Sequence, residues 1–134
     1  MEIVNRKSKF EFEFLDSYTA GIVLTGVEVK FIRDGKLSFS DSYCQFQNGE
    51  LFLKNVSISG IGTDNIKRDR KLLLNKRELK KIQRTFFSNT TIVPYKIFTN
   101  NKGLFKVEIM IAKGKKLYDK RETIKKRDLE REIH

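Results

Sequence analysis

The residues best able to do chemistry in this sequence are the cations of a long run near its end. Residues 113–134 hold nine Lys or Arg against five Asp or Glu, and they carry no apolar stripe that could be buried. Side chains this charged stay in water or lie against a negatively charged surface. Most charge runs are solvated helices, so the count alone leaves that interpretation open. The chemistry that the run could do is the binding of phosphate groups.

A second group of cations lies in residues 67–84, which hold nine basic and two acidic residues. The two segments account for the whole formal charge of +11, because the charges elsewhere cancel. A solvated helix face usually mixes both signs, whereas here only Asp69 and Glu78 dilute the positive charge. This distribution favours contacts with the phosphates of a nucleic acid. The cations expected on the exposed side of a helix are Lys76, Arg77, Lys80, Lys81 and Arg84.

The sequence holds few residues that could serve in catalysis or metal binding. Cys44 is the single cysteine, which excludes an internal disulfide and predicts a cytoplasmic protein. His134 is the single histidine, so we expect no zinc site and no histidine-based acid–base catalysis. We also see no apolar run of membrane-spanning length and no signal-peptide core. The sequence therefore predicts a binding protein without cofactor or metal, and neither an enzyme nor a membrane protein.

Two segments carry the signal of a helix start, in which Thr or Asn is followed three residues later by Glu. The first pair is Thr25 and Glu28, and it predicts a short helix directly after Thr25. The second pair is Asn75 and Glu78, and it places Asn75 as the cap of a helix carried by residues 72–85.

The clearest strand signal is a hairpin turn at Asn48-Gly49, because both positions of this turn need residues that tolerate a positive φ. Counting outward from the turn places one set of side chains on a common face. Cys44 belongs to that set, so we expect it to be a small core residue and not a reactive thiol. The residues expected to face the core from this hairpin are Cys44, Phe46, Leu51 and Leu53.

Further strands are predicted at residues 10–14, 20–24, 91–99 and 105–111, where apolar residues alternate or recur. Pro94 cannot donate a hydrogen bond to a neighbouring strand, so its strand should be bulged there or lie at an edge. Short antiparallel strands with flanking helices predict a mainly β fold, as a small antiparallel barrel that hides its strand edges. We expect this barrel to occupy residues 1–112 and the basic C-terminal tail to occupy residues 113–134.

Aromatic side chains offer a second kind of contact with RNA, because unpaired bases stack on exposed rings. The chain has eleven Phe and four Tyr. Most of the phenylalanines lie at inward strand positions, where packing in the core explains them. We expect one or two of the others to stack on bases. The candidates are Tyr18, Phe31, Tyr43, Phe52, Phe98 and Tyr118.

Five segments together resemble the SmpB family, the bacterial proteins that partner transfer-messenger RNA (tmRNA). Residues 112–128 read AKGKKLYDKRETIKKRD, which matches the closing signature of the family, and residues 5–7 match its NRKA element. Residues 20–30 are similar to AGIVLTGTEVKSLR, and residues 70–78 to RKLLLHKRE with Asn in place of His. Residues 41–43 match its DSY element. The motifs occur in family order and span nearly the whole chain.

The resemblance implies an oligonucleotide-binding (OB-type) barrel that binds the tRNA-like domain of tmRNA and escorts it to a stalled ribosome. It also implies that the tail enters the small-subunit decoding region and the empty mRNA channel. The partners would be tmRNA and the ribosome, without a membrane, and we expect a monomer. The alternative from the residues alone is a structural ribosomal or translation-factor barrel that binds rRNA. An RNA-processing enzyme is the third and least supported alternative.

The resemblance also assigns residues to the two contacts. It links Glu28, Asn75 and Lys106 to tmRNA binding, although the capping box gives Glu28 an equally good structural role. The basic residues expected on the same surface are Lys30, Lys71, Lys76 and Arg77. The tail should be disordered when free and helical on the ribosome, since little in it can pack. Its ribosome-contacting residues would be Gly114, Lys115, Lys116, Asp119, Lys120, Arg121, Lys125, Lys126 and Arg127.

Overall fold

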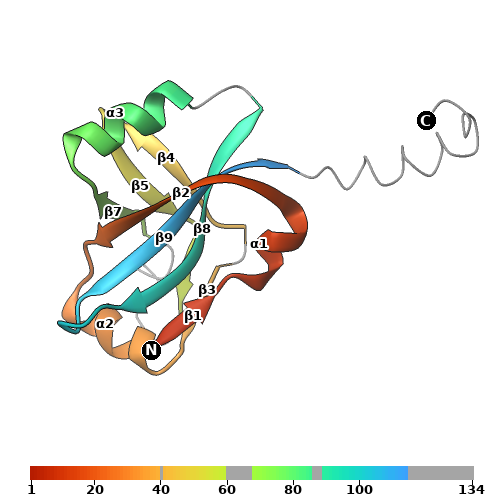
Figure 1. Ribbon diagram of the computed structural model, residues 1–134. Helices are drawn as coiled ribbons and strands as arrows, with labels where there is room; N and C mark the ends of the chain where they lie inside the picture. Colours follow the sequence, from red (N-terminus) through yellow and green to blue (C-terminus); the bar gives the residue numbers. More distant parts are fainter. Residues whose placement is uncertain (40, 60–67, 86–88, 115–134) are drawn as a thin grey trace, which may run out of the picture.

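The computed structural model describes residues 1–39, 41–59, 68–85 and 89–114. These ranges form a mainly β domain with short helices at its periphery (Figure 1). None of the helices in these ranges is long and apolar enough to cross a membrane. The tail from residue 115 onward lies outside the described residues, so its predicted disorder and its predicted helix on the ribosome stay predictions.

Twelve elements follow one another along the described chain. In order they are β1 (Glu2–Val4), α1 (Arg6–Glu11), β2 (Phe12–Ile22), α2 (Gly26–Arg33), β3 (Leu37–Ser38), β4 (Tyr43–Gln47), β5 (Glu50–Lys54), β6 (Ser57–Ile58), β7 (Arg70–Leu73), α3 (Lys76–Thr85), β8 (Thr90–Thr99) and β9 (Phe105–Gly114).

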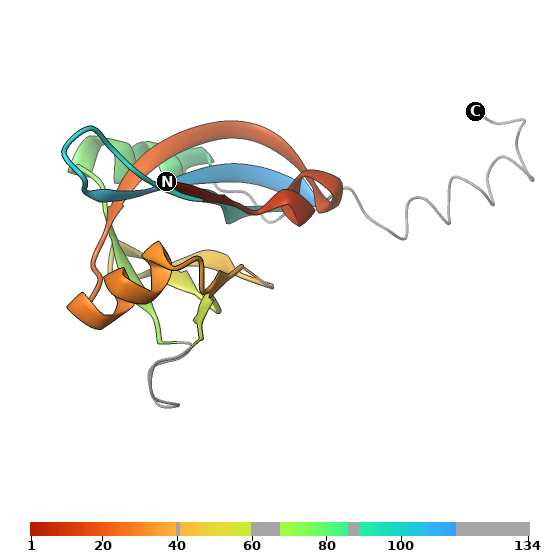
Figure 2. The ribbon, with the colours of Figure 1, turned by 90° about the horizontal axis from the view of Figure 1, so that it is seen from below.

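The long strands are joined into a ring of antiparallel neighbours, in the order β8-β4-β5-β7-β2-β9 with β9 pairing back to β8. The link between β4 and β8 is a single residue pair, Cys44 with Ile92. Figure 2 shows β2 and β9 arching over one side of the domain, with α2 on the other side. The predicted mainly β fold with flanking helices is confirmed, and the ring of pairings agrees with a small barrel.

The hairpin of β4 and β5 has the predicted register. Cys44 pairs with Leu53 and Phe46 with Leu51, and the turn residues Asn48 and Gly49 have φ angles of 53° and 80°. Cys44 is buried, and burial raises the pKa of its thiol well above the usual range. The thiol is therefore a core side chain, as predicted.

The hairpin of β8 and β9 supplies the other half of the core. Its register shifts between Pro94 and Lys96, so of the two alternatives predicted at the proline, a bulge or an edge position, the bulge is found. The predicted inward residues of β9 are all buried, and they pack with Ile92 and Ile97 of β8. These inward residues are Phe105, Val107, Ile109 and Ile111.

The prediction of a strand over residues 10–14 was wrong for its first two residues. Helix α1 occupies Arg6–Glu11, and Phe10 is 76% exposed instead of facing the core. The cause is tertiary, because Asn5 donates hydrogen bonds from its backbone to Tyr95 O and from its side chain to Pro94 O. These bonds anchor the start of α1 on β8, and the Ser8 hydroxyl donates to the Asn5 carbonyl within the turn.

Two other boundaries also differ from the prediction. The strand predicted over residues 20–24 is the end of one long strand, β2, which stops at Ile22. In the segment 72–85 the helix begins at Lys76, directly after the predicted cap Asn75, but Leu72 and Leu73 belong to β7, which pairs with β2 and β5. Pairing on both sides outweighs the helix propensity of the Leu-rich segment, which is a weak preference.

Candidate RNA interface

Helix α2 begins with the predicted capping box. The Thr25 backbone N–H donates to Glu28 Oε1 at 2.9 Å, and the Glu28 N–H donates to Thr25 Oγ1 at 3.1 Å. These bonds satisfy N–H groups that have no partner within the first turn of a helix, and so they fix where α2 starts. The helix then turns Glu28 into the interior, whereas Lys30 is exposed on its outer side.

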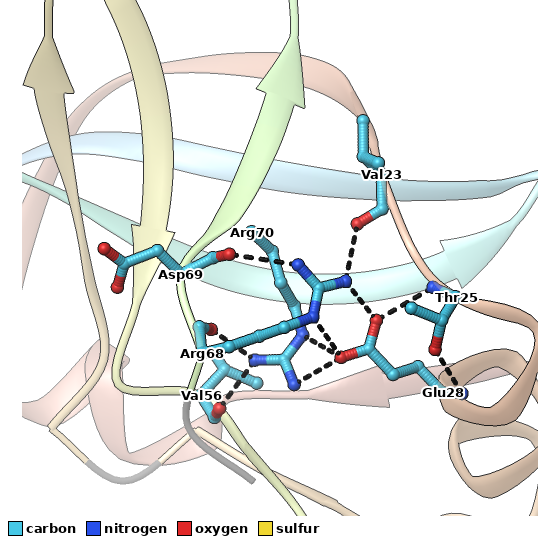
Figure 3. Close-up of polar contacts among 7 residues, drawn as sticks. All are labelled: Val23, Thr25, Glu28, Val56, Arg68, Asp69 and Arg70. Atoms are coloured by element: carbon cyan, nitrogen blue, oxygen red, sulfur yellow. Dashed lines mark hydrogen bonds and ion pairs between the residues drawn. The ribbon is translucent and has the colours of Figure 1, made fainter. Parts of the chain in front are cut away.

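The buried carboxylate of Glu28 is the centre of a cluster with the buried Arg70 and the partly exposed Arg68 (Figure 3). Arg70 donates from Nε to Oε2 at 2.9 Å, and its Nη2 lies 2.7 Å from the same oxygen. Arg68 donates from Nε to Oε2 at 2.9 Å and from Nη2 to Oε1. Other N–H groups of the two guanidinium groups bond the backbone carbonyls of Val23, Val56, Arg68 and Asp69.

The electrostatics of the cluster keep Glu28 charged. Burial alone would raise the pKa of Glu28, but the hydrogen bonds from Arg68 and the Thr25 N–H, with the charge of Arg70, hold that pKa below its ordinary value. Burial lowers the pKa of the Arg70 guanidinium, and the carboxylate opposes that effect. Both oxygens of Glu28 are engaged by protein donors. The capping role is therefore confirmed, while the contact of Glu28 with RNA stays a prediction.

Strand β7 presents its other side to solvent. Alternation along the strand turns Arg70 and Leu72 inward and Lys71 and Leu73 outward. Lys71 stands opposite Phe52 of β5, and Leu73 stands in one row with Gly21 of β2 and Lys106 of β9. We call this outward set the β7 face: Phe52, Lys71, Leu73 and Lys106.

A concavity of about 300 Å³ lies in this face between Leu73 and Lys106. Gly21 lies between them in the row and also lines the concavity, and a Cβ added there would lie 3.3 Å from Leu73 Cβ. Leu73 is 51% exposed and Leu104, which also lines the concavity, is 56% exposed. Sequence reasoning missed both leucines. Strand alternation in the Leu72-Leu73-Leu74 run was the signal that could have identified Leu73.

Helix α3 follows β7 directly and adds the strongest positive charge. Asn75 caps the helix through its side chain, which accepts from the Glu78 N–H at 2.8 Å, and Glu78 accepts from the Asn75 N–H at 3.2 Å. Ile82 is fully buried and Leu79 packs beside the core, as the narrow apolar stripe predicted. The predicted cations are all exposed on the remaining surface of the helix: Lys76, Arg77, Lys80, Lys81 and Arg84.

The fold thus brings most of the predicted tmRNA-binding residues together. Lys71 and Lys106 lie on the β7 face, and Asn75, Lys76 and Arg77 continue from the end of the same strand. Lys71 forms an ion pair with Glu50, which already neutralises part of its positive charge. Lys30 is placed separately on α2. This arrangement can hold several phosphates while leaving an apolar concavity between them.

Most of the aromatic candidates for stacking are partly enclosed. Tyr18 and Phe31 pack against the core, and the ammonium group of Lys96 lies 5.4 Å from the ring centroid of Phe98. Tyr43 is 37% exposed, and Phe52 is half-buried on the β7 face. Tyr118 lies outside the described residues. Which of these rings stacks on RNA stays a prediction.

The predicted ribosome-contacting residues fall almost entirely outside the described part of the chain. Gly114 is the last residue of β9 and pairs with Phe12 at the start of β2. The predicted tail residues from Lys115 to Arg127 lie beyond that point.

A family model for the SmpB protein matches residues 2–134. A relative from Christiangramia forsetii is 48% identical, over 99% of this chain and 88% of the relative, and is named SsrA-binding protein. A relative from Parabacteroides distasonis with the same name is 50% identical, over 99% of this chain and 91% of the relative. A chain of the solved structure described as "tmRNA-SmpB: a journey to the center of the bacterial ribosome" aligns with a TM-score of 0.73 at 38% identity, covering 96% of this chain and 94% of that chain.

Proposed function

This chain belongs to the SmpB family, and we propose that it binds tmRNA and delivers it to stalled ribosomes in trans-translation. Its relatives are named for SsrA binding, and its structural neighbour comes from a tmRNA–SmpB assembly on the bacterial ribosome. The protein acts by binding and not as an enzyme, in the cytoplasm where ribosomes work. The same assignment makes tmRNA and the ribosome its two partners.

One observation supports the proposal that the body of the protein binds RNA. The cations of α3 are exposed on the helix that continues directly from β7, and Lys71 and Lys106 lie on the β7 face. Phosphates neutralised by such cations release counterions, which supplies much of the affinity for a nucleic acid. The apolar concavity beside Lys106 then adds contacts that depend on shape. We assign the tmRNA contacts to Lys30, Lys71, Asn75, Lys76, Arg77 and Lys106.

Glu28 contributes to this surface indirectly, from the interior of the domain. Its carboxylate cannot meet phosphate favourably, and both oxygens already accept hydrogen bonds from Arg68, Arg70 and Thr25. Because Arg70 is the first residue of β7, the cluster fixes the strand that carries Lys71 and Leu73. We accordingly assign the barrel, expected over residues 1–112, to tmRNA and the basic tail, expected over residues 113–134, to the ribosome. Lys113 and Gly114 at the start of that tail still belong to β9.

The first test is selectivity, measured by gel shift with the tRNA-like domain of tmRNA and with an ordinary tRNA at two salt concentrations. We expect tighter binding of the tRNA-like domain, and a preference that persists at the higher salt. Equal binding of both RNAs with a steep loss at high salt would instead support a barrel that binds rRNA through charge alone.

A further inference from the structure

We propose that α1 and β8 form a second RNA site, in which an unpaired base of single-stranded RNA stacks on the ring of Phe10. The site is a concavity of about 590 Å³. The residues that line it are Val4, Arg6, Lys9, Phe10 and Tyr95. We call it the Phe10 site. It is separate from the β7 face, and its test does not depend on the function proposed above.

The exposure of Phe10 is the first observation. Its ring is 76% exposed, whereas Phe12 and Phe14, which continue the same alternation, are half-buried. A single exposed apolar side chain needs no explanation by itself. Phe10 differs from such a residue because it borders a concavity that contains a second aromatic ring and two cations.

The second ring is held in place. Phe14 meets Tyr95 edge to face, with 5.5 Å between the ring centroids and 69° between the planes. The Lys9 ammonium lies 5.2 Å from the Tyr95 ring centroid. Tyr95 therefore forms a fixed wall with a cation above it, while Phe10 is the ring that is left open to solvent for stacking.

The charge of the site selects an anionic ligand. Arg6 and Lys9 line the concavity, and no acidic residue of the described ranges does. A larger concavity that also borders α1, of about 870 Å³, has mixed charge, because Glu11 and Asp41 line it together with Arg6 and Lys7. An exposed ring beside two cations matches single-stranded RNA, whose bases stack on aromatic side chains while its phosphates meet Lys or Arg.

The position of the site supports the same ligand. α1 lies at the end of the domain away from α2 and α3 (Figures 1 and 2). The strand that follows α1 pairs Phe12 with Gly114 and Glu13 with Lys113, at the end of β9. Lys113, the first cation of the basic run, therefore lies on the strand that pairs with the segment directly after α1.

The test uses the full chain and two labelled probes, an oligoadenylate 8-mer and an 8-mer with the same backbone but without bases. Phe10→Ala removes the apolar ring without changing the charge, and Phe10→Leu keeps an apolar side chain without a ring. We expect both variants to lose roughly fivefold or more in affinity for the oligoadenylate, the range for one stacked base, with no change for the abasic probe. Val27→Ala, which alters a residue of α2 that is 56% exposed, is the matched control and should bind like the wild type.

Phe10→Trp gives a direct readout, because the chain contains no other tryptophan. We expect this variant to keep the affinity of the wild type and its fluorescence to be quenched by the oligoadenylate. Affinity for the tRNA-like domain should be unchanged in Phe10→Ala. A failure of the Phe10 site proposal can therefore be told apart from a failure of the tmRNA proposal. Wild-type affinity in Phe10→Leu, or fluorescence that saturating oligoadenylate leaves unchanged, would overturn stacking. Loss of binding to phosphatidylglycerol vesicles in Phe10→Ala, with RNA binding intact, would assign the site to a membrane instead.

Discussion

Arg70 and Glu28 form an ion pair that is closed to solvent: Nη2 of Arg70 is 2.7 Å from Oε2 of Glu28, and the side chains are 0% and 1% exposed. The pair connects the first turn of α2 to the first residue of β7. Since β7 carries Lys71 and Leu73 on its outer side, the interior pair and the proposed RNA surface share one strand. Loss of the pair should therefore affect the fold first and RNA binding through the fold.

Glu28→Gln should lower the free energy of unfolding by about 3–5 kcal/mol, because it leaves the Arg70 guanidinium buried without its counter-charge. Urea unfolding followed by circular dichroism measures this difference. Glu50→Gln is the matched control, since it removes a carboxylate from the ion pair with Lys71, whose side chains are 42% and 44% exposed. The control should cost less than about 1 kcal/mol. Equal losses of unfolding free energy in the two variants would mean that burial does not increase the contribution of an ion pair to stability.

Acid should remove the advantage of the wild type over Glu28→Gln. The pKa of Glu28 in the folded protein lies below its ordinary value, so the carboxylate binds its proton more readily in the unfolded chain, where the pKa is about 4.3. The stabilisation is therefore complete above the unfolded pKa, and it is lost as the pH falls through the folded pKa. Urea unfolding at pH 7, 5, 4 and 3 should show the two proteins converging at the acidic end. A gap that is constant over this range would mean that Glu28 does not titrate as inferred.

The local signals in the sequence predicted those parts of the fold that neighbouring residues determine. Both capping boxes and the Asn48-Gly49 turn depend on contacts within a few residues, and all three were confirmed. The errors arose where contacts with distant segments determine the local structure. Phe10 continues a strand pattern, yet the bonds from Asn5 to β8 place it on a helix.

The candidate site shows the same division. The charge of α3 and the cap at Asn75 could be read from the sequence, because an amphipathic helix with a basic face needs no partner to be recognised. The ion pairs of Glu28 with Arg68 and Arg70 join residues about forty positions apart, so no local pattern predicts them. The row of Leu73, Gly21 and Lys106 likewise exists only in the register of three strands.

Removal of charge from α3 should weaken binding of the tRNA-like domain and reduce its dependence on salt. For Lys76→Ala with Arg77→Ala, the slope of log affinity against log salt should become shallower by about 0.9 for each phosphate that the variant no longer neutralises. Lys7→Ala with Lys36→Ala removes the same formal charge from exposed positions on α1 and between α2 and β3, and serves as the control. Filter binding at four salt concentrations measures both slopes. If the two double variants behave alike, net charge and not the position of α3 governs affinity.

The tail should be required on the ribosome and not for tmRNA affinity. Asp119→Ala with Lys120→Ala and Arg121→Ala changes three residues in a segment that begins after β9 ends, so the β7 face and α3 keep their sequence and packing. We expect wild-type affinity for the tRNA-like domain in a gel shift, because those contacts are assigned to the body. In a reconstituted translation reaction stalled on an mRNA without a stop codon, addition of the tmRNA-encoded tag should be abolished. The control variant Lys7→Ala with Glu11→Ala, which removes an exposed ion pair of α1, should still support tagging. A large loss of tmRNA affinity in the triple variant would mean that body and tail bind tmRNA as one surface.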